Sequence, residues 1–239
     1  MTRRSILLPS TLLRSQLRGA VGATPGGQTR SSGVGYRLGD PGQPARIPTL
    51  LIALFDDSGS VTGSMGTDPL SNRFAEVAHA LSEVARRGSR HELGAVLHFD
   101  SPCSSDVAPT PITRRGFKRL RAGLCVPPEG AGSSELAPSL RRAVEIAGAH
   151  PECEVTLVVL SDLHLLDPDS GRALAELAAF SGDVHVVVLG GRLAPGVLNE
   201  RITVTHIGPE DRPGAVARAL FASLTTHRPG SHLIGSEPR

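Results

Sequence analysis

The stretch T-L-L-I-A-L-F-D-D-S-G-S, residues 49–60, holds the pattern that decides the fold. Its first seven residues, 49–55, are a nearly unbroken apolar run of strand length. An apolar run without polar alternation indicates a strand buried on both faces. The five residues that follow are acidic, small or hydroxyl-bearing. A buried strand that ends in such a turn is typical of a parallel sheet covered by helices, in which ligands lie at the carboxyl ends of the strands.

Further strand and helix patterns alternate along the rest of the chain. We predict strands at 93–99, 155–160, 184–189 and 202–206, with a short edge strand near 108–112. Apolar residues that recur at helical spacing predict helices at 74–85, around 117–124, and at 136–147, 173–178 and 213–224. This alternation predicts an α/β fold with a doubly wound, mostly parallel central sheet and helices on both faces.

The chain divides by composition into an arm, a domain and a tail. Residues 1–47 are basic and rich in Gly, Ser and Pro, which predicts a partly disordered arm. Leucines along one side of residues 1–19 are compatible with a short amphipathic helix there, and disorder is favoured for 20–32. We expect the domain to span 48–227, followed by a disordered tail at 228–239.

Charge and composition exclude several classes of function. The 239 residues carry a formal charge of +2, and this balance gives no broad signal for nucleic-acid binding. The longest apolar runs, Leu50–Phe55 and Val155–Leu160, are far shorter than the roughly 20 residues of a transmembrane helix. Pro9 interrupts the apolar start of the chain, which argues against a signal peptide.

The numbers of cysteines and lysines indicate where the protein is located and what kind of genome encodes it. The three cysteines show no C-x-x-C spacing, and their odd number without a dense framework predicts reduced thiols and a cytoplasmic location. Lys118 is the single lysine among 25 basic residues, and such an arginine-rich composition suggests a GC-rich bacterial genome.

Oxygen-bearing side chains follow the first strand and a later one. Asp56, Ser58 and Ser60 alternate in the first turn, and Asp162 follows the strand at 155–160. Carboxylates and hydroxyls are hard donors that suit Mg²⁺, Mn²⁺ or Ca²⁺ rather than zinc or copper. We therefore predict a divalent-cation site at the carboxyl ends of these strands.

A third loop offers one more hydroxyl to this site. The stretch G-A-G-S-S-E-L, residues 130–136, precedes a predicted helix and contains Ser133 and Ser134. Either serine can supply an oxygen from a direction different from those of the two strand ends, so the choice between them stays open.

Taken together, residues 49–226 resemble a von Willebrand factor A domain. The metal-ion-dependent adhesion site (MIDAS) of that family reads D-x-S-x-S after the first strand, with a threonine in a G-G-T loop and an aspartate in a later T-D-G turn. The stretch 56–60 matches the first motif without gaps. In the other two, Ser134 replaces the threonine, with Ser133 as the competing candidate, and S-D-L puts Asp162 in the place of the aspartate.

The resemblance implies a role for each residue. Ser58, Ser60 and Ser134 would ligate the metal directly, while Asp56 and Asp162 would hold its waters or bind it. In the family, a Glu or Asp of a partner protein fills the coordination position that stays open. The implied function is a non-catalytic, divalent-cation-dependent protein–protein interaction module, with Mg²⁺ (or Mn²⁺ or Ca²⁺) as its cofactor.

Other interpretations were weighed against this one. Asp57 is interpreted as a turn residue. No H-G-T and G-T-S pair, G-x-S-x-G elbow or G-x-x-x-x-G-K-[ST] loop occurs, so the sequence offers no nucleophile-plus-base pair. The remaining alternatives are a metal-dependent hydrolase, in which Asp56 and Asp162 position a metal-bound water, and a scaffold that has lost its metal.

Overall fold

A six-stranded sheet forms the centre of the domain in the computed structural model, which describes residues 36–234 apart from 69, 130–131, 191–192 and 194–195. The strand order is β4-β3-β2-β5-β6-β7. The strands are β2 (Thr49–Phe55), β3 (Glu92–His98), β4 (Val107–Pro111), β5 (Glu154–Ser161), β6 (Asp183–Leu189) and β7 (Thr203–Ile207). Every neighbouring pair is parallel except β3 and β4, which confirms the predicted mostly parallel sheet.

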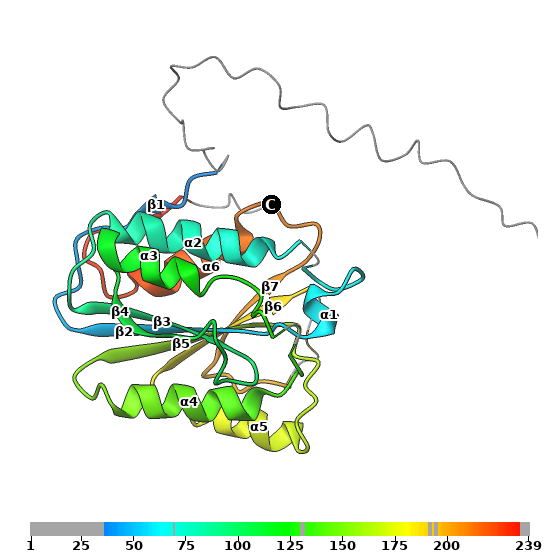
Figure 1. Cartoon of the computed structure of the whole chain (residues 1–239). Coiled ribbons are helices and arrows are strands. Elements are labelled where there is room, and N and C mark those ends of the chain that lie inside the picture. Colours follow the sequence, from blue (N-terminus) through cyan, green and yellow to red (C-terminus); the bar gives the residue numbers. More distant parts are fainter. Residues whose placement is uncertain (1–35, 69, 130–131, 191–192, 194–195, 235–239) are drawn as a thin grey trace, which may run out of the picture. The chain divides into compact units, whose positions relative to one another are not determined.

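Helices cover both faces of the sheet, as predicted (Figure 1). On one face lie α2 (Asn72–Ala85), α3 (Arg114–Ala122) and α6 (Ala215–Thr225), and on the other α4 (Leu136–Gly148) and α5 (Ser170–Ala178). A single helical turn, α1 (Gly59–Thr62), occupies part of the expected irregular loop, because the Ser58 carbonyl accepts from the backbone N–H of Val61 and of Thr62. Within the described residues, no helix combines the length and apolarity that crossing a membrane requires.

The unbroken apolar run of β2 is explained by its central place in the sheet. Successive side chains of a strand point to opposite faces. Leu51 and Phe55 therefore pack beneath α2 and α6, whereas Ile52 and Leu54 pack against the α4 and α5 side. All four are buried, so neither face of β2 has room for a polar residue.

The order of the strands reverses direction at β2, which has β3 on one side and β5 on the other. Phe55, the last residue of β2, lies opposite His98 of β3 and Leu160 of β5. The turns after β2 and β5 thus leave the same edge of the sheet at its topological switch point, where ligands bind in such folds.

The folded unit extends beyond the predicted bounds of 48–227. Gly39–Asp40 (β1) pairs antiparallel with His232–Leu233 (β8). Arg228 is buried, forms an ion pair with Glu92 at 2.5 Å, and donates to the Pro41 carbonyl. Residues 36–47 and 228–234 therefore belong to the domain rather than to the arm and the tail. The expectations for 1–19, 20–32 and 235–239 lie outside the described residues.

Candidate metal-binding site

The turns after β2 and β5 are joined at Asp56. Its backbone N–H donates to the Leu160 carbonyl at 3.0 Å, which continues the pairing of the two strands. Its carboxylate is buried and held at both oxygens: Oδ1 accepts from the Ser58 N–H at 2.9 Å, and Oδ2 accepts from the Ser161 hydroxyl at 2.6 Å. Two neighbouring strand ends thus fix the orientation of this carboxylate.

The hydroxyls of Ser58 and Ser60 lie side by side. Their Oγ atoms are 3.0 Å apart, with Ser58 buried and Ser60 half-buried. Ser58 is the N-cap residue of α1 and Ser60 lies in its single turn, so this turn sets the spacing of the two hydroxyls. The predicted first motif therefore gathers one carboxylate and two hydroxyls at one strand end.

Asp162 carries an oxygen that lacks a hydrogen bond. Oδ1 of this buried residue accepts from the His164 N–H at 3.1 Å, whereas Oδ2 is buried and has no hydrogen-bond partner among the described residues. Nδ1 of His164 lies 3.4 Å from Oδ2, which gives an ion pair only when the imidazole is protonated and is longer than an ordinary N–H···O bond. A buried carboxylate oxygen without a partner is costly, and a cation is the kind of group that would satisfy it.

The two carboxylates also repel each other. Burial is the main cause that raises the pKa of Asp56 above its ordinary value, and the negative charge of Asp162 raises it further, against the hydrogen bonds from Ser161 and Ser58. Within the described chain, neither carboxylate forms an ion pair with a lysine or arginine. A pair of buried, mutually repelling carboxylates beside two hydroxyls fits a hard divalent cation.

The third loop distinguishes Ser133 from Ser134. The Ser133 hydroxyl donates to Oδ1 of Asp100 at 2.6 Å, and its N–H donates to Oδ2 at 2.5 Å. The Ser134 hydroxyl has no hydrogen bond within the described chain, and its carbonyl accepts from the Leu166 N–H in the loop after β5. Since Ser133 is engaged elsewhere and Ser134 is linked to the β5 loop, the structure favours Ser134 as the third-loop oxygen.

Asp57 is part of a buried ion network, so its interpretation as a turn residue was wrong. Its Oδ1 lies 2.6 Å from Nη2 of Arg73, and its Oδ2 lies 2.5 Å from Nδ1 of His98. Arg73 also donates to Oδ2 of Asp68 at 2.8 Å and to the Asp56 carbonyl at 3.2 Å. Through these contacts Arg73 holds the backbone at Asp56 and the side chain of Asp57 in place. No local sequence signal pairs Asp57 with partners 16 and 41 residues away.

A second group of potential metal ligands is already satisfied. His98, Cys103 and Asp106 lie close together, but both ring nitrogens of His98 are in use, because Nε2 donates to the Gly123 carbonyl at 2.9 Å. Asp106 accepts from the His98 N–H and from the Ser101 hydroxyl. This group is therefore a structural cluster and leaves no imidazole nitrogen for a metal.

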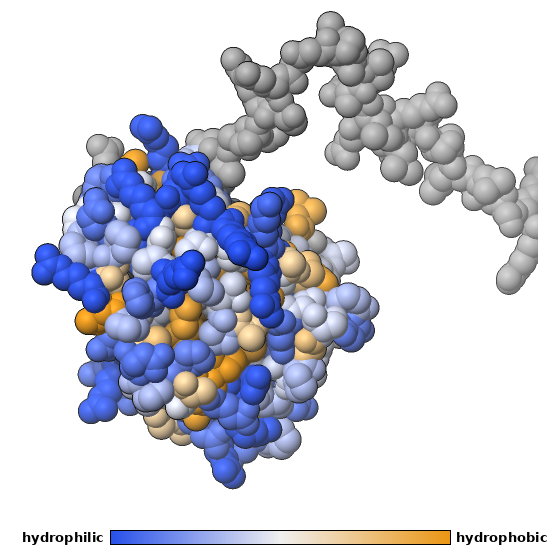
Figure 2. Space-filling model, turned by 60° about the vertical axis from the view of Figure 1, so that its left-hand side comes forward, coloured by the Kyte–Doolittle hydropathy of each residue, from blue (hydrophilic) through white to orange (hydrophobic). Residues whose placement is uncertain are grey.

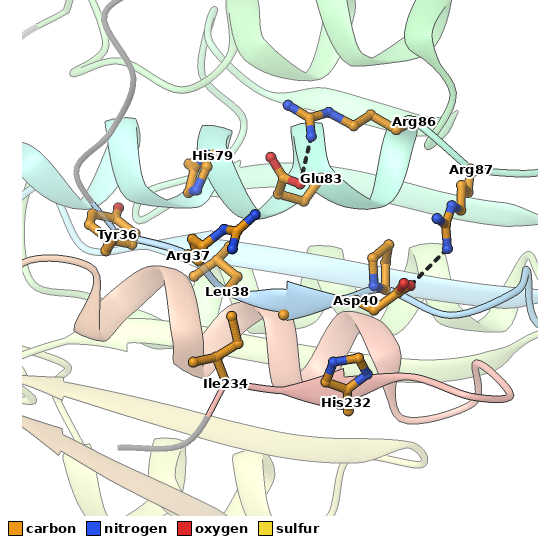
Figure 3. Close-up of a pocket in the computed structure, with 12 residues that line it drawn as sticks. Tyr36, Arg37, Leu38, Asp40, His79, Glu83, Arg86, Arg87, His232 and Ile234 are labelled. Carbon is orange, nitrogen blue, oxygen red and sulfur yellow. Dashed lines mark hydrogen bonds and ion pairs between the residues drawn. The ribbon is translucent and has the colours of Figure 1, made fainter. Parts of the chain in front are cut away.

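A cavity of about 470 Å³ lies away from these loops, between α2, β1 and β8 (Figure 3). Two of its arginines are paired with neighbouring acids: Arg86 with Glu83 at 3.0 Å and Arg87 with Asp40 at 2.8 Å. The cavity holds none of the predicted site residues, so the candidate metal-binding site remains at the carboxyl edge of the sheet.

Comparisons with solved structures place this architecture among known folds. A von Willebrand factor type A structure from Catenulispora acidiphila matches with a TM-score of 0.54 and 13% identity, over 79% of this chain and 48% of that one. Proximal thread matrix protein 1 from the mussel byssus, solved with a zinc-occupied MIDAS motif, matches with a TM-score of 0.51 and 17% identity, over 77% of this chain and 48% of that one. The pilus adhesin SpaC from Lactobacillus rhamnosus GG matches with a TM-score of 0.57 and 13% identity, over 77% of this chain and 31% of that one.

These matches establish the fold. At such identities they show that the chain has the von Willebrand factor A fold, as its sequence resemblance implies. The chain spans about half or less of the length of each of these structures. No protein-family model matches the sequence, and no curated protein matches it.

Proposed function

We propose that this chain, with its von Willebrand factor A fold, is a non-catalytic interaction module that binds a partner protein through a divalent cation. The observation that carries the proposal is the buried Oδ2 of Asp162, which has no hydrogen bond from any residue that the structure describes and lies on a strand end joined to that of Asp56. A cation between these carboxylates would both satisfy the unpaired oxygen and offset the repulsion of the two charges.

The proposed donor set combines two strand ends and one loop. Its members all carry hard oxygens and are Asp56, Ser58, Ser60, Ser134 and Asp162. Mg²⁺, Mn²⁺ or Ca²⁺ suits these donors. One divalent cation against two carboxylates leaves little net charge, so a third carboxylate from a partner is still attracted to the ion.

The hydroxyls at the site are poorly placed to act as nucleophiles. Ser58 and Ser60 contact each other, and neither hydroxyl bonds to a histidine ring or a lysine within the described residues. An activated serine needs an adjacent base, so these two hydroxyls give no support to catalysis through a serine nucleophile. We also propose a cytoplasmic location, where the three free cysteines would stay reduced.

A thermal melt with and without Mg²⁺ or Mn²⁺ tests the metal site. Metal at about 100 times its dissociation constant should add roughly 2.7 kcal/mol to the free energy of unfolding, or about 5–10 °C in melting temperature for a domain of this size. Asp56→Ala should abolish this shift. Asp183→Ala is the matched control, because Asp183 is exposed at the opposite, amino end of β6. An unchanged melt, or an equal shift in D56A, would refute the metal site.

The interaction itself needs a second experiment. The full chain, used as bait in Mg²⁺ and in EDTA, should retain a partner only in Mg²⁺, and Asp56→Ala should lose that partner. A metal-dependent hydrolase activity that disappears in D56A would instead favour the alternative in which the metal activates a water.

A further inference from the structure

The most exposed large apolar side chains of the described residues lie in loops that leave one edge of the sheet. Met65, Leu70 and Leu166 are 97%, 79% and 69% exposed, whereas no other large apolar side chain in the described part of the chain exceeds the 50% of Val144. All three lie in the loops that follow β2 and β5, the strands whose ends carry the proposed metal donors. Figure 2, in which the side away from α1 comes forward, shows a mostly hydrophilic surface with scattered apolar spots.

Backbone hydrogen bonds tie the segments that carry Met65 and Leu166 to the proposed metal site. The loop that carries Met65 turns tightly between Gly63 and Gly66 and folds back where the Thr67 N–H donates to the Ser60 carbonyl at 3.0 Å. Leu166 is anchored on the other side, because its N–H donates to the Ser134 carbonyl at 3.0 Å. Met65 and Leu166 thus project from segments that contact a proposed ligand directly.

The surroundings of the site carry little charge. Residues 58–67 contain no Asp, Glu, Lys or Arg, and residues 163–166 read L-H-L-L. Asp56 and Asp162 are buried beneath these residues, and the nearest other acids, Asp68, Asp100 and Glu135, are only partly exposed. Isolated apolar side chains on a surface are ordinary, but several large, highly exposed ones in the loops beside one site are typical of a surface that binds a partner.

We propose that Met65, Leu70 and Leu166 form an apolar rim around the metal site, and that the rim selects a partner segment in which an Asp or Glu is flanked by large apolar residues. This inference rests on the proposed function: the carboxylate would complete the coordination of the cation, and its apolar neighbours would cover Met65 on one side and Leu166 on the other. Burial of both apolar surfaces would then supply affinity that the carboxylate alone lacks.

The terminal residues of the sequence do not match this description, and we place the carboxylate on a partner protein. Residues 1–35 contain no Asp or Glu and cannot supply the carboxylate. Residues 235–239 contain Glu237, but its neighbours are Ser236 and Pro238 rather than large apolar residues.

A positional peptide array tests the inference. Each peptide has a fixed central Glu and varied residues at the two positions on either side, and the full chain is applied in Mg²⁺ and in EDTA. Leu, Ile, Met and Phe should be enriched beside the Glu, and binding should require Mg²⁺. In solution, Met65→Ser and Leu166→Ser should each bind the best peptide about tenfold more weakly. Val144→Ser, an exposed apolar residue on α4, should bind it as the unmodified chain does.

The outcomes separate this inference from the proposed function. Both serine variants should keep the Mg²⁺-induced melting shift, since neither removes a proposed ligand. Mg²⁺-dependent binding without an apolar preference, or M65S and L166S variants that bind like V144S, would overturn the rim and leave the metal function standing. Apolar peptides that bind equally in EDTA would also overturn it. A melt that Mg²⁺ does not move would overturn both.

Discussion

Replacing Arg73 with methionine tests whether the buried ion network supports the first metal motif. The side chain of Arg73 is fully buried and reaches three acceptors: Asp57 at 2.6 Å, Asp68 at 2.8 Å and the Asp56 carbonyl at 3.2 Å. Methionine fills a similar volume but provides no charge and no donor. The substitution therefore leaves Asp57 buried with His98 as its remaining partner.

The magnitude follows from the burial of the groups left behind. Removing one partner of a buried ion pair costs about 3–5 kcal/mol, because the other charge stays uncompensated. His98 still pairs with Asp57, Asp68 is partly exposed to water, and the buried Nε of Arg73 itself lacks a hydrogen bond. These three observations favour the lower end, so we expect Arg73→Met to cost about 3 kcal/mol, or roughly 6–12 °C in melting temperature for a domain of this size.

Urea unfolding at neutral pH, with thermal melts alongside, measures this loss. Arg142→Met is the matched control, because Arg142 and Glu145 form an exposed ion pair worth at most about 0.5 kcal/mol. The double variant Asp57→Asn, Arg73→Met should recover more than about 1 kcal/mol relative to R73M, since it also removes the stranded charge. An R73M variant within about 1 kcal/mol of the unmodified chain would show that the network does not carry the stability assigned to it.

Three further predictions concern other parts of the domain. Ser134→Ala should weaken Mg²⁺ binding about tenfold in a metal titration of the melting temperature, while Ser133→Ala retains it; the reverse ranking would assign the third-loop ligand to Ser133. A chain that ends at residue 227 lacks Arg228 and leaves Glu92 buried without its ion pair, so its urea midpoint should report a loss of at least about 3 kcal/mol. Burial lowers the pKa of the His185 imidazole, so below about pH 6.5 the unfolded chain binds a proton there before the folded chain does, and the free energy of unfolding decreases as the pH falls. Urea melts from about pH 7 to 5 should show a smaller decrease for His185→Asn than for the unmodified chain. The same decrease in both would contradict this prediction.

Local patterns in the sequence were sufficient to predict the architecture, and they nominated the candidate donors that remain a proposal. The apolar run at 49–55 predicts a strand buried on both faces, because a central parallel strand has no solvent-facing side, and β2 is such a strand. Asp56 and Asp162 were proposed as donors for a related reason. Parallel strands end at one edge of the sheet, so acidic residues that follow two neighbouring strands come together there.

Tertiary structure alone decided which polar groups are partners. The sequence points to Ser134 but leaves Ser133 as a competing candidate. In the structure, Asp100 in the loop after β3 engages Ser133 and leaves Ser134 beside the β5 loop. Arg228 lies 136 residues from Glu92, and the closeness of their side chains moves the end of the domain past the predicted boundary. The physical reason is that apolar spacing reflects residues that are close in the chain and can be read from the sequence. A charged side chain pairs instead with any group that folding brings within a few ångströms, however distant that group is in the sequence.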